Sequence, residues 1–381
     1  MKNDVAGVQN TILFRVDTNS TIGAGHLMRC IALAYGFQHY QLVCIFLVND
    51  ETEHYLQGLN DFPFKIKNND KGDLSEFSWI ELVAKSMTAI GIVLDGYQFS
   101  ENYRDTLSSI GLPIIAIDDT NTGGKLFADV VINPVSSAGT LNYKQTAPGA
   151  TLLLGSDYIL LRPEFIKASM SNKLTDKTQS MSDQSYQRRQ ACLITFGASD
   201  ISGLTIPVLD ALTMNELDVS PITVVTGGAY PSTEQLRTLI SSLKASLKAN
   251  LINTAGPIIT HLEHVRNMAP VLKGAKMAIS AAGGTVFELA AMGVPTILLV
   301  VADNQLNAAL EQQDKGWCQV IDARQSLSMP DLISAAQRLW ENNELRLEMH
   351  RCAIQNAVTD GAQRAAGEIV NHIKNKTRES K

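Results

Sequence analysis

The chain has 381 residues, a length that fits two α/β domains of roughly 150 to 200 residues each. Its formal net charge of −6 argues against a broad nucleic-acid-binding surface, so no nucleic-acid partner is expected. The sequence has neither a signal-peptide core nor an apolar run long enough to span a membrane, and we expect a cytoplasmic protein with no membrane partner. Five scattered cysteines without a C-x-x-C pair indicate reduced thiols.

The first informative stretch is an apolar strand, a glycine turn and a helix. Ile12–Val16 has the β-branched, apolar character of a buried strand and leads into a polar turn. After Gly23 and Gly25, apolar residues recur at helical spacing and predict a helix packed against a sheet. His26 therefore falls in the first turn of a helix at the carboxyl end of a strand, which is the edge where open α/β sheets bind ligands.

The residues around His26 allow three interpretations. The helix field disfavours imidazolium, so the side chain would be neutral and able to accept a proton. Gly23 and Gly25 also resemble the start of a dinucleotide fingerprint, but Met28 in place of the third glycine would crowd the helix–strand contact. In the third interpretation the glycines only form a turn and His26 is a helix-cap residue.

Further apolar runs alternate with helical stretches and predict a parallel sheet. Asp95 follows one of these strands, and Tyr97 would place a hydroxyl over the same edge as His26. Capping of the next turn is an open alternative for Asp95 and for the pair Asp118-Asp119. The predicted strands are Gln41–Val48, Gly91–Leu94, Pro113–Ile117 and Val130–Ile132, and the predicted helices include Trp79–Met87 and Glu101–Ile110.

The alternation of apolar strands and helical stretches is interrupted after residue 166 and resumes at residue 191. Residues 167–190 are polar, with few large apolar side chains, and predict an exposed linker or insertion. Beyond them, each predicted strand runs into small or polar residues, which indicates a second doubly wound domain. These strands are Ala191–Phe196, Ile222–Val225, Met277–Ser280 and Thr296–Val301. We therefore predict two Rossmann-like parallel-sheet domains that face a cleft.

Two turns in the second half are rich in small residues. Gly197–Asp200 and Gly283–Thr285 each follow a strand directly, and their backbone N–H groups suit a diphosphate. Glu288, in the next helix, is placed to accept hydrogen bonds from ribose hydroxyls, although a glutamate answering the helix macrodipole is the alternative. His261 and His264 lack a third ligand, and we expect neither a metal nor another cofactor.

Several segments together resemble the nucleotide-sugar hydrolase family of pseudaminic acid biosynthesis, which releases UDP from UDP-2,4-diacetamido-2,4,6-trideoxy-β-L-altropyranose. The segments are 23–30 (GAGHLMRC), 154–165 (LGSDYILLRPEF), 195–200 (TFGASD), 281–289 (AAGGTVFEL), 302–305 (ADNQ) and 360–362 (DGA). That family is related to the muramyl-pentapeptide N-acetylglucosaminyltransferase and shares its GT-B fold. The resemblance implies an N-terminal domain over 1–166, the insertion 167–190, a UDP-binding domain over 191–340, and a helical segment over 341–381 that crosses back.

The resemblance also implies roles for matching positions. His26 matches the family's catalytic histidine and Glu288 its ribose-binding glutamate. The implied substrate-binding residues are Gly25, Asp95, Tyr97, Arg162, Asn304 and Gln305, and the implied UDP-binding residues are Gly197, Ser199, Val265, Gly283, Gly284, Thr285 and Glu288. The chain departs from the family at Gly96, where histidine is more frequent, and at Ala198, which replaces a glycine.

The implied reaction is attack by water on the anomeric carbon of the UDP-sugar, with His26 as general base and with inversion. We expect a monomer whose partner is the UDP-sugar alone. Two alternatives remain: a GT-B glycosyltransferase with a UDP-N-acetylhexosamine donor, in which His26 deprotonates an acceptor hydroxyl, and a nucleotide-sugar-binding protein without turnover.

Overall fold

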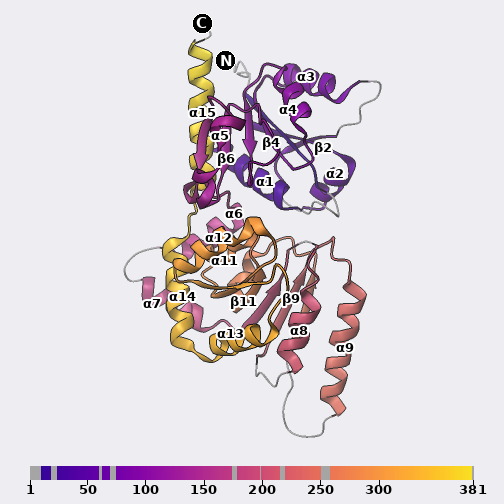
Figure 1. Ribbon diagram of the computed structural model, residues 1–381, viewed down its shortest axis with the longest axis vertical. Coiled ribbons are helices and arrows are strands. Elements are labelled where there is room, and N and C mark those ends of the chain that lie inside the picture. The colour runs from indigo at the N-terminus through magenta and orange to yellow at the C-terminus, as the bar shows by residue number, and fades with distance from the viewer. Residues whose placement is uncertain are drawn as a thin grey trace, which may run out of the picture. The chain divides into compact units, whose positions relative to one another are not determined.

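The computed structural model describes residues 10–18, 24–59, 62–68, 74–173, 178–197, 199–214, 219–249 and 258–379 (Figure 1). The chain divides into two compact units. The first comprises Met1–Pro163 and Asp360–Lys381, and the second comprises Glu164–Thr359. Each unit is built on one parallel sheet, which confirms the predicted α/β fold class.

The first unit has a seven-stranded sheet in the order β3-β2-β1-β4-β5-β6-β7. Its strands are β1 (Thr11–Val16), β2 (Val43–Val48), β3 (Lys65–Asn68), β4 (Ala89–Asp95), β5 (Ile114–Ile117), β6 (Val130–Asn133) and β7 (Thr151–Leu154). All neighbours are parallel, and the register pairs Val16 of β1 with Asp95 of β4. The loops that follow these strands therefore gather at one edge of the sheet.

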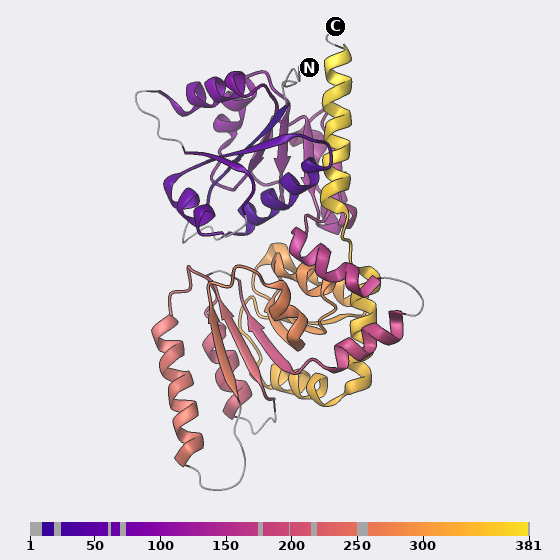
Figure 2. The same ribbon diagram turned by 180° about the vertical axis from the view of Figure 1, so that it is seen from behind.

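The helices of the first unit cover both faces of this sheet. They are α1 (Gly25–Gln38), α2 (Asp50–Gln57), α3 (Glu76–Ser86), α4 (Glu101–Ser108), α5 (Tyr143–Thr146) and α15 (Gly361–Glu379), with 3₁₀ turns η1 (Ser136–Thr140) and η2 (Ser156–Tyr158). Helices α1 and α15 share one core with alternate residues of β1, including Ile12 and Phe14. Trp79 and Ile80 of α3 pack on the other face, against Leu13. Figure 2 shows α15, in yellow, running along the first unit.

The second unit has a six-stranded parallel sheet in the order β10-β9-β8-β11-β12-β13. Its strands are β8 (Ala191–Thr195), β9 (Ile222–Thr226), β10 (Ile259–Glu263), β11 (Ala275–Ala281), β12 (Thr296–Val300) and β13 (Cys318–Asp322). Its helices are α6 (Pro163–Lys173), which begins at the unit boundary, α7 (Thr178–Gln187), α8 (Thr205–Met214), α9 (Thr233–Ala249), α10 (Ala269–Gly274), α11 (Thr285–Ala291), α12 (Asp303–Asp314), α13 (Met329–Glu341) and α14 (Asn343–Asn356). No described helix is both long and apolar enough to cross a lipid bilayer.

The prediction of an exposed linker over residues 167–190 is wrong for the described part of that stretch, which is mostly helical. Tyr186 at the end of α7 is 2% exposed and stacks on His350 of α14. Arg189 is also buried, and its guanidinium donates a 2.8 Å hydrogen bond to the carbonyl that follows α11. The stretch is polar in composition, but Tyr186 and Arg189 help to anchor it to the second unit, because both bury long apolar parts.

Candidate active site

His26 lies in the first turn of α1, at the carboxyl edge of the first sheet, and its side chain is buried. Its Nδ1 atom is 2.7 Å from Oδ1 of Asp95, the last residue of β4. β1 and β4 are neighbours in the sheet, and Val16 at the end of β1 pairs with Asp95 at the end of β4. The first turn of α1 thus places a histidine against a strand-end carboxylate.

The atoms around His26 relate its tautomer to two neighbours. Nη2 of Arg29 is 3.0 Å from Nδ1 of His26 and 2.6 Å from Oδ1 of Asp95. In the tautomer with the proton on Nδ1, both nitrogens donate to the same oxygen of Asp95 and Nε2 carries the lone pair. In the other tautomer, Nδ1 accepts from Arg29.

Asp95 is more deeply placed than the sequence suggested. It is 1% exposed and accepts from Nε of Arg29 at 2.6 Å, and from the Cys30 thiol at 3.6 Å, in addition to His26. Burial, followed by the charge of Asp95, raises the pKa of Cys30, so its thiol stays protonated as a donor. The expectation that Asp95 contacts the substrate does not fit this burial, because its oxygens are already held by protein groups. Its position is that of a group that orients His26.

A second carboxylate continues the network. Asp119, which follows β5, accepts from Nη1 of Arg29 and from the hydroxyl of Tyr97, each at 2.6 Å. Burial by itself raises the pKa of Asp119, but the charge and hydrogen bond of Arg29 and the Tyr97 hydroxyl outweigh it and hold that pKa below its usual value. Asp118 instead accepts from Tyr143 and from the backbone N–H of residue 121, as the turn-capping alternative predicts.

Tyr97 forms the open side of this cluster. Its side chain is 60% exposed, and its ring meets the His26 ring edge-on with centroids 4.7 Å apart. Gly96 has φ of +147°, a conformation that side-chain-bearing residues rarely adopt. The glycine that departs from the family pattern is therefore required by the backbone that carries Tyr97 to this place.

The sequence analysis did not identify Arg29 as a site residue and assigned Asp119 no role at the site. The spacing could have indicated Arg29, because it is three residues after His26 and lies on the same face of the helix. Two other predicted residues, Gly25 and Arg162, are placed as follows. Gly25 opens α1, is exposed and has no neighbouring atoms within 4 Å of where a Cβ would lie. Arg162 lies beside Tyr55 at the end of α2.

The predicted UDP-binding turns and the predicted substrate-binding turn share one edge of the second sheet. Strands β8, β11 and β12 are neighbours, so the UDP-binding turns at Gly197 and Gly283 and the substrate-binding turn at Asn304 follow adjacent carboxyl ends. Gly197 has φ of +82°, and among the described residues, chain neighbours aside, no heavy atom lies within 4 Å of where a Cβ would be placed on Gly197, Gly283 or Gly284. The backbone at these turns is therefore open on that side, and a ligand can approach it closely.

Several side chains next to these turns bond to the backbone or begin the following helix. Ser199 precedes Asp200, which is buried and accepts from the backbone N–H groups of residues 204 and 205, so it caps α8. Thr285 begins α11, and Glu288 lies in its first turn. Oε1 of Gln305 accepts from the N–H of residue 301 at 3.0 Å, which leaves its amide N–H groups for other partners.

Val265 follows β10, two strands from β8 on the same edge. The preceding His264 has φ of +51°, and a Cβ on Gly228 would lie 2.9 Å from its ring. His261 lies in β10, and its Nε2 atom is 2.8 Å from the Thr226 hydroxyl. Within the described residues, no group of three histidine, cysteine or acidic side chains has a metal-binding arrangement.

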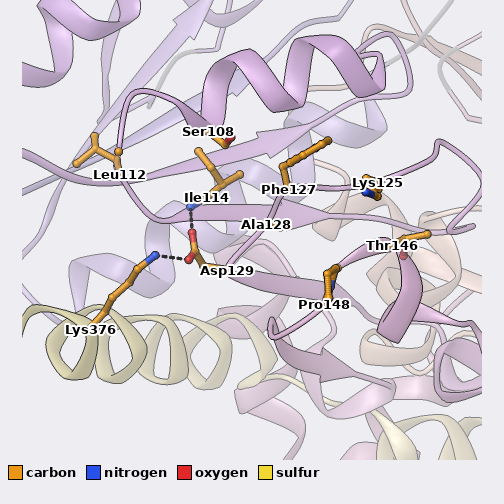
Figure 3. A pocket seen from close by; sticks show the side chains of 12 residues that line it. Ser108, Leu112, Ile114, Lys125, Phe127, Ala128, Asp129, Thr146, Pro148 and Lys376 are labelled. Atoms are coloured by element: carbon orange, nitrogen blue, oxygen red, sulfur yellow. Dashed lines mark hydrogen bonds and ion pairs between the residues drawn. The ribbon is translucent and has the colours of Figure 1, made fainter. Parts of the chain in front are cut away.

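A separate hollow of about 400 Å³ lies at the amino ends of β5 and β6, on the edge opposite His26 (Figure 3). Its wall is mixed, with Ile114 and Phe127 beside the ion pair of Asp129 and Lys376. The Asp129 carboxylate also accepts from the N–H of Ile114 at 2.8 Å. Asp129 and Lys376 thus pair with each other at the end of the sheet away from the site.

Comparison with protein families adds a match for the second half of the chain. Residues 195–365 match the glycosyltransferase family 28 C-terminal domain. Among curated proteins, the spore coat polysaccharide biosynthesis protein SpsG of Bacillus subtilis is 24% identical over 86% of this chain and 88% of that protein. The UDP-2,4-diacetamido-2,4,6-trideoxy-β-L-altropyranose hydrolase of Campylobacter jejuni is 21% identical over 70% of this chain and 90% of that protein. An uncharacterized protein of Methanocaldococcus jannaschii is 25% identical over 74% of this chain, which spans about half (54%) of its length.

Solved structures match along nearly the whole chain. MurG of Acinetobacter baumannii has a TM-score of 0.63 at 18% identity and covers 95% of this chain and 99% of its own. MnaA of S. aureus, solved with UDP, has a TM-score of 0.62 at 15% identity and covers 97% of each chain. The chain thus has the GT-B fold.

Proposed function

We propose that the protein is a hydrolase that releases UDP from UDP-2,4-diacetamido-2,4,6-trideoxy-β-L-altropyranose by attack of water on the anomeric carbon, with inversion. The observation that carries the proposal is the buried 2.7 Å contact between His26 and Asp95 at the carboxyl edge of the first sheet. The Campylobacter relative bears the name of this activity and aligns over 70% of the chain. The UDP-bound structural neighbour supports the nucleotide part of the substrate.

His26 is suited to remove a proton from water. Its Nδ1 donates to Asp95, so Nε2 can accept, and the imidazolium formed in the transition state lies against a carboxylate. UDP leaves with its charge on the diphosphate and needs no general acid. Tyr97, whose ring lies against that of His26, is proposed to hold the sugar and the attacking water.

The departing diphosphate is proposed to bind at the glycine turns of the second unit. The backbone at Gly197, Gly283 and Gly284 is open to a ligand. Donors fixed before the reaction stabilise the developing charge without reorganisation. Glu288 is proposed to hold the ribose, and the segment at Val265 to recognise the base.

The match of residues 195–365 to a glycosyltransferase domain favours one alternative. A GT-B transferase would use the same donor site, with a UDP-N-acetylhexosamine, and His26 would deprotonate an acceptor hydroxyl instead of water. The two functions differ in whether UDP is released without an acceptor.

The test is UDP release by the purified protein from UDP-2,4-diacetamido-2,4,6-trideoxy-β-L-altropyranose and from UDP-N-acetylglucosamine, each with and without a chelator. We expect rapid release from the first alone, unaffected by the chelator. Release from neither, with UDP still bound, would reject this hydrolase and favour a transferase that awaits its acceptor.

A further inference from the structure

Arg29 contacts two carboxylates that serve different side chains. Its Nε and Nη2 atoms donate to Asp95, and its Nη1 atom donates to Asp119, all at 2.6 Å. Asp95 in turn accepts from His26, and Asp119 accepts from Tyr97. One planar guanidinium therefore connects the histidine to the tyrosine whose ring lies against it.

We propose that Arg29 is a positioning residue that bridges the carboxylate partners of His26 and Tyr97, and that its charge sets how readily His26 takes a proton. This inference rests on the proposed function, in which His26 is the base. A guanidinium can make three such bonds in fixed directions, whereas lysine offers a single ammonium without the fork.

The charges around Arg29 determine whether its loss raises or lowers the proton affinity of His26. The groups that face Arg29 are His26 and Cys30 on its own helix, Asp95 at the end of β4, and Tyr97 and Asp119 in the following loops. With His26 neutral and the thiol and phenol protonated, the two aspartates and the arginine leave one net negative charge. Protonation of His26 brings the cluster to zero. Without the arginine, His26 would face two uncompensated carboxylates and would bind a proton more readily.

The experiment is an NMR titration of the His26 imidazole in the full-length, ¹⁵N-labelled protein, with His26→Asn used to assign its signals. The variants are Arg29→Met, which removes the charge, and Arg29→Lys, which keeps it. Arg364→Met is the matched control, because Arg364 also pairs with carboxylates of the first unit but is partly exposed. We expect Arg29→Met to raise the titration midpoint by about one pH unit or more, and Arg364→Met to leave it unchanged.

Measurement of kcat and KM in the same variants then tests whether Arg29 positions the reacting groups. Arg29→Lys should shift the midpoint much less than Arg29→Met, yet lower kcat about 100-fold with little change in KM, because the reacting groups lose their fixed geometry. If Arg29→Met does not fold, the double variant Arg29→Met/Asp119→Asn restores the net charge. It should titrate like the wild type but turn over slowly.

Two results would overturn the proposal: a wild-type midpoint in folded Arg29→Met, or full turnover in Arg29→Lys. The titration needs no substrate. If the wild-type protein releases UDP from no sugar, the proposed function fails, while the titration still decides whether Arg29 controls the protonation of His26.

Discussion

Nδ1 of His26 and Oδ1 of Asp95 lie 2.7 Å apart, and the carboxylate is 1% exposed. The contact joins the first turn of α1 to the last residue of β4. In the tautomer whose Nδ1 donates to this carboxylate, the imidazole presents Nε2 as its acceptor. The pair therefore supports general-base chemistry at this edge.

Replacement of the histidine tests this assignment. We expect His26→Ala to lower kcat by about 10²–10⁴-fold, the usual contribution of a general base, with UDP binding unchanged by calorimetry. His39→Ala, at the exposed other end of α1, is the control and should keep full turnover. Near-normal turnover in His26→Ala would remove the histidine from the mechanism.

Asp95→Asn tests the orienting carboxylate. The amide N–H₂ of asparagine can donate to Nδ1, which would favour the tautomer with the proton on Nε2 and block proton acceptance. We expect kcat to fall by about 10²–10⁴-fold with the fold intact by circular dichroism. A loss of less than about threefold would show that the tautomer does not depend on Asp95.

The sequence predicted the alternating strands and helices well wherever the strands are buried apolar runs. It missed the partly exposed strands at the four sheet edges, which are β3 (Lys65–Asn68), β7 (Thr151–Leu154), β10 (Ile259–Glu263) and β13 (Cys318–Asp322). Such strands are stabilised by hydrogen bonds to the adjacent strand of the sheet. The local pattern of apolar and polar residues does not show which strand is adjacent.

The same limit applies to the site. His26, Asp95 and Tyr97 could be placed on one edge from the strand ends, because parallel strands share a direction. The bridge through Arg29 to Asp119 joins residues 90 positions apart, and depends on which strand lies next to which. Spacing alone does not give that order.

Gly36 offers a test of the packing behind the site. A Cβ on this residue of α1 would lie 2.4 Å from the carbonyl oxygen of Ala362, in the backbone of α15. Alanine normally favours a helix, but here the two helices would have to move apart, and we expect Gly36→Ala to lower the free energy of unfolding by about 1–3 kcal/mol. Gly139, with open space around it, is the control, and Gly139→Ala should change it by less than about 0.5 kcal/mol. Equal denaturation midpoints for the two variants would contradict the close contact.

His350 makes the second unit sensitive to acid. Burial lowers the pKa of His350 from 6.5 to about 4, although its hydrogen bond to the Gly293 carbonyl acts in the opposite direction. The folded state keeps this histidine neutral while the unfolded chain protonates it. Its contribution to stability is therefore full above about pH 6.5 and is lost as the pH falls toward 4, by up to about 3 kcal/mol.

The comparison for this prediction is His350→Gln, which keeps an amide donor for the carbonyl and does not titrate. Urea unfolding of the second unit at several pH values should show the wild-type advantage shrinking between pH 7 and 4. Parallel pH dependences for the two proteins would contradict the lowered pKa.

Hydrolysis at the anomeric carbon is tested most directly by the fate of the oxygen when UDP-2,4-diacetamido-2,4,6-trideoxy-β-L-altropyranose reacts in H₂¹⁸O. Water attack at the anomeric carbon predicts one ¹⁸O atom in the released sugar and none in UDP, and NMR of the first-formed sugar should show the inverted anomer. Label in UDP would mean that water attacks phosphorus, and would contradict the proposed attack on the anomeric carbon.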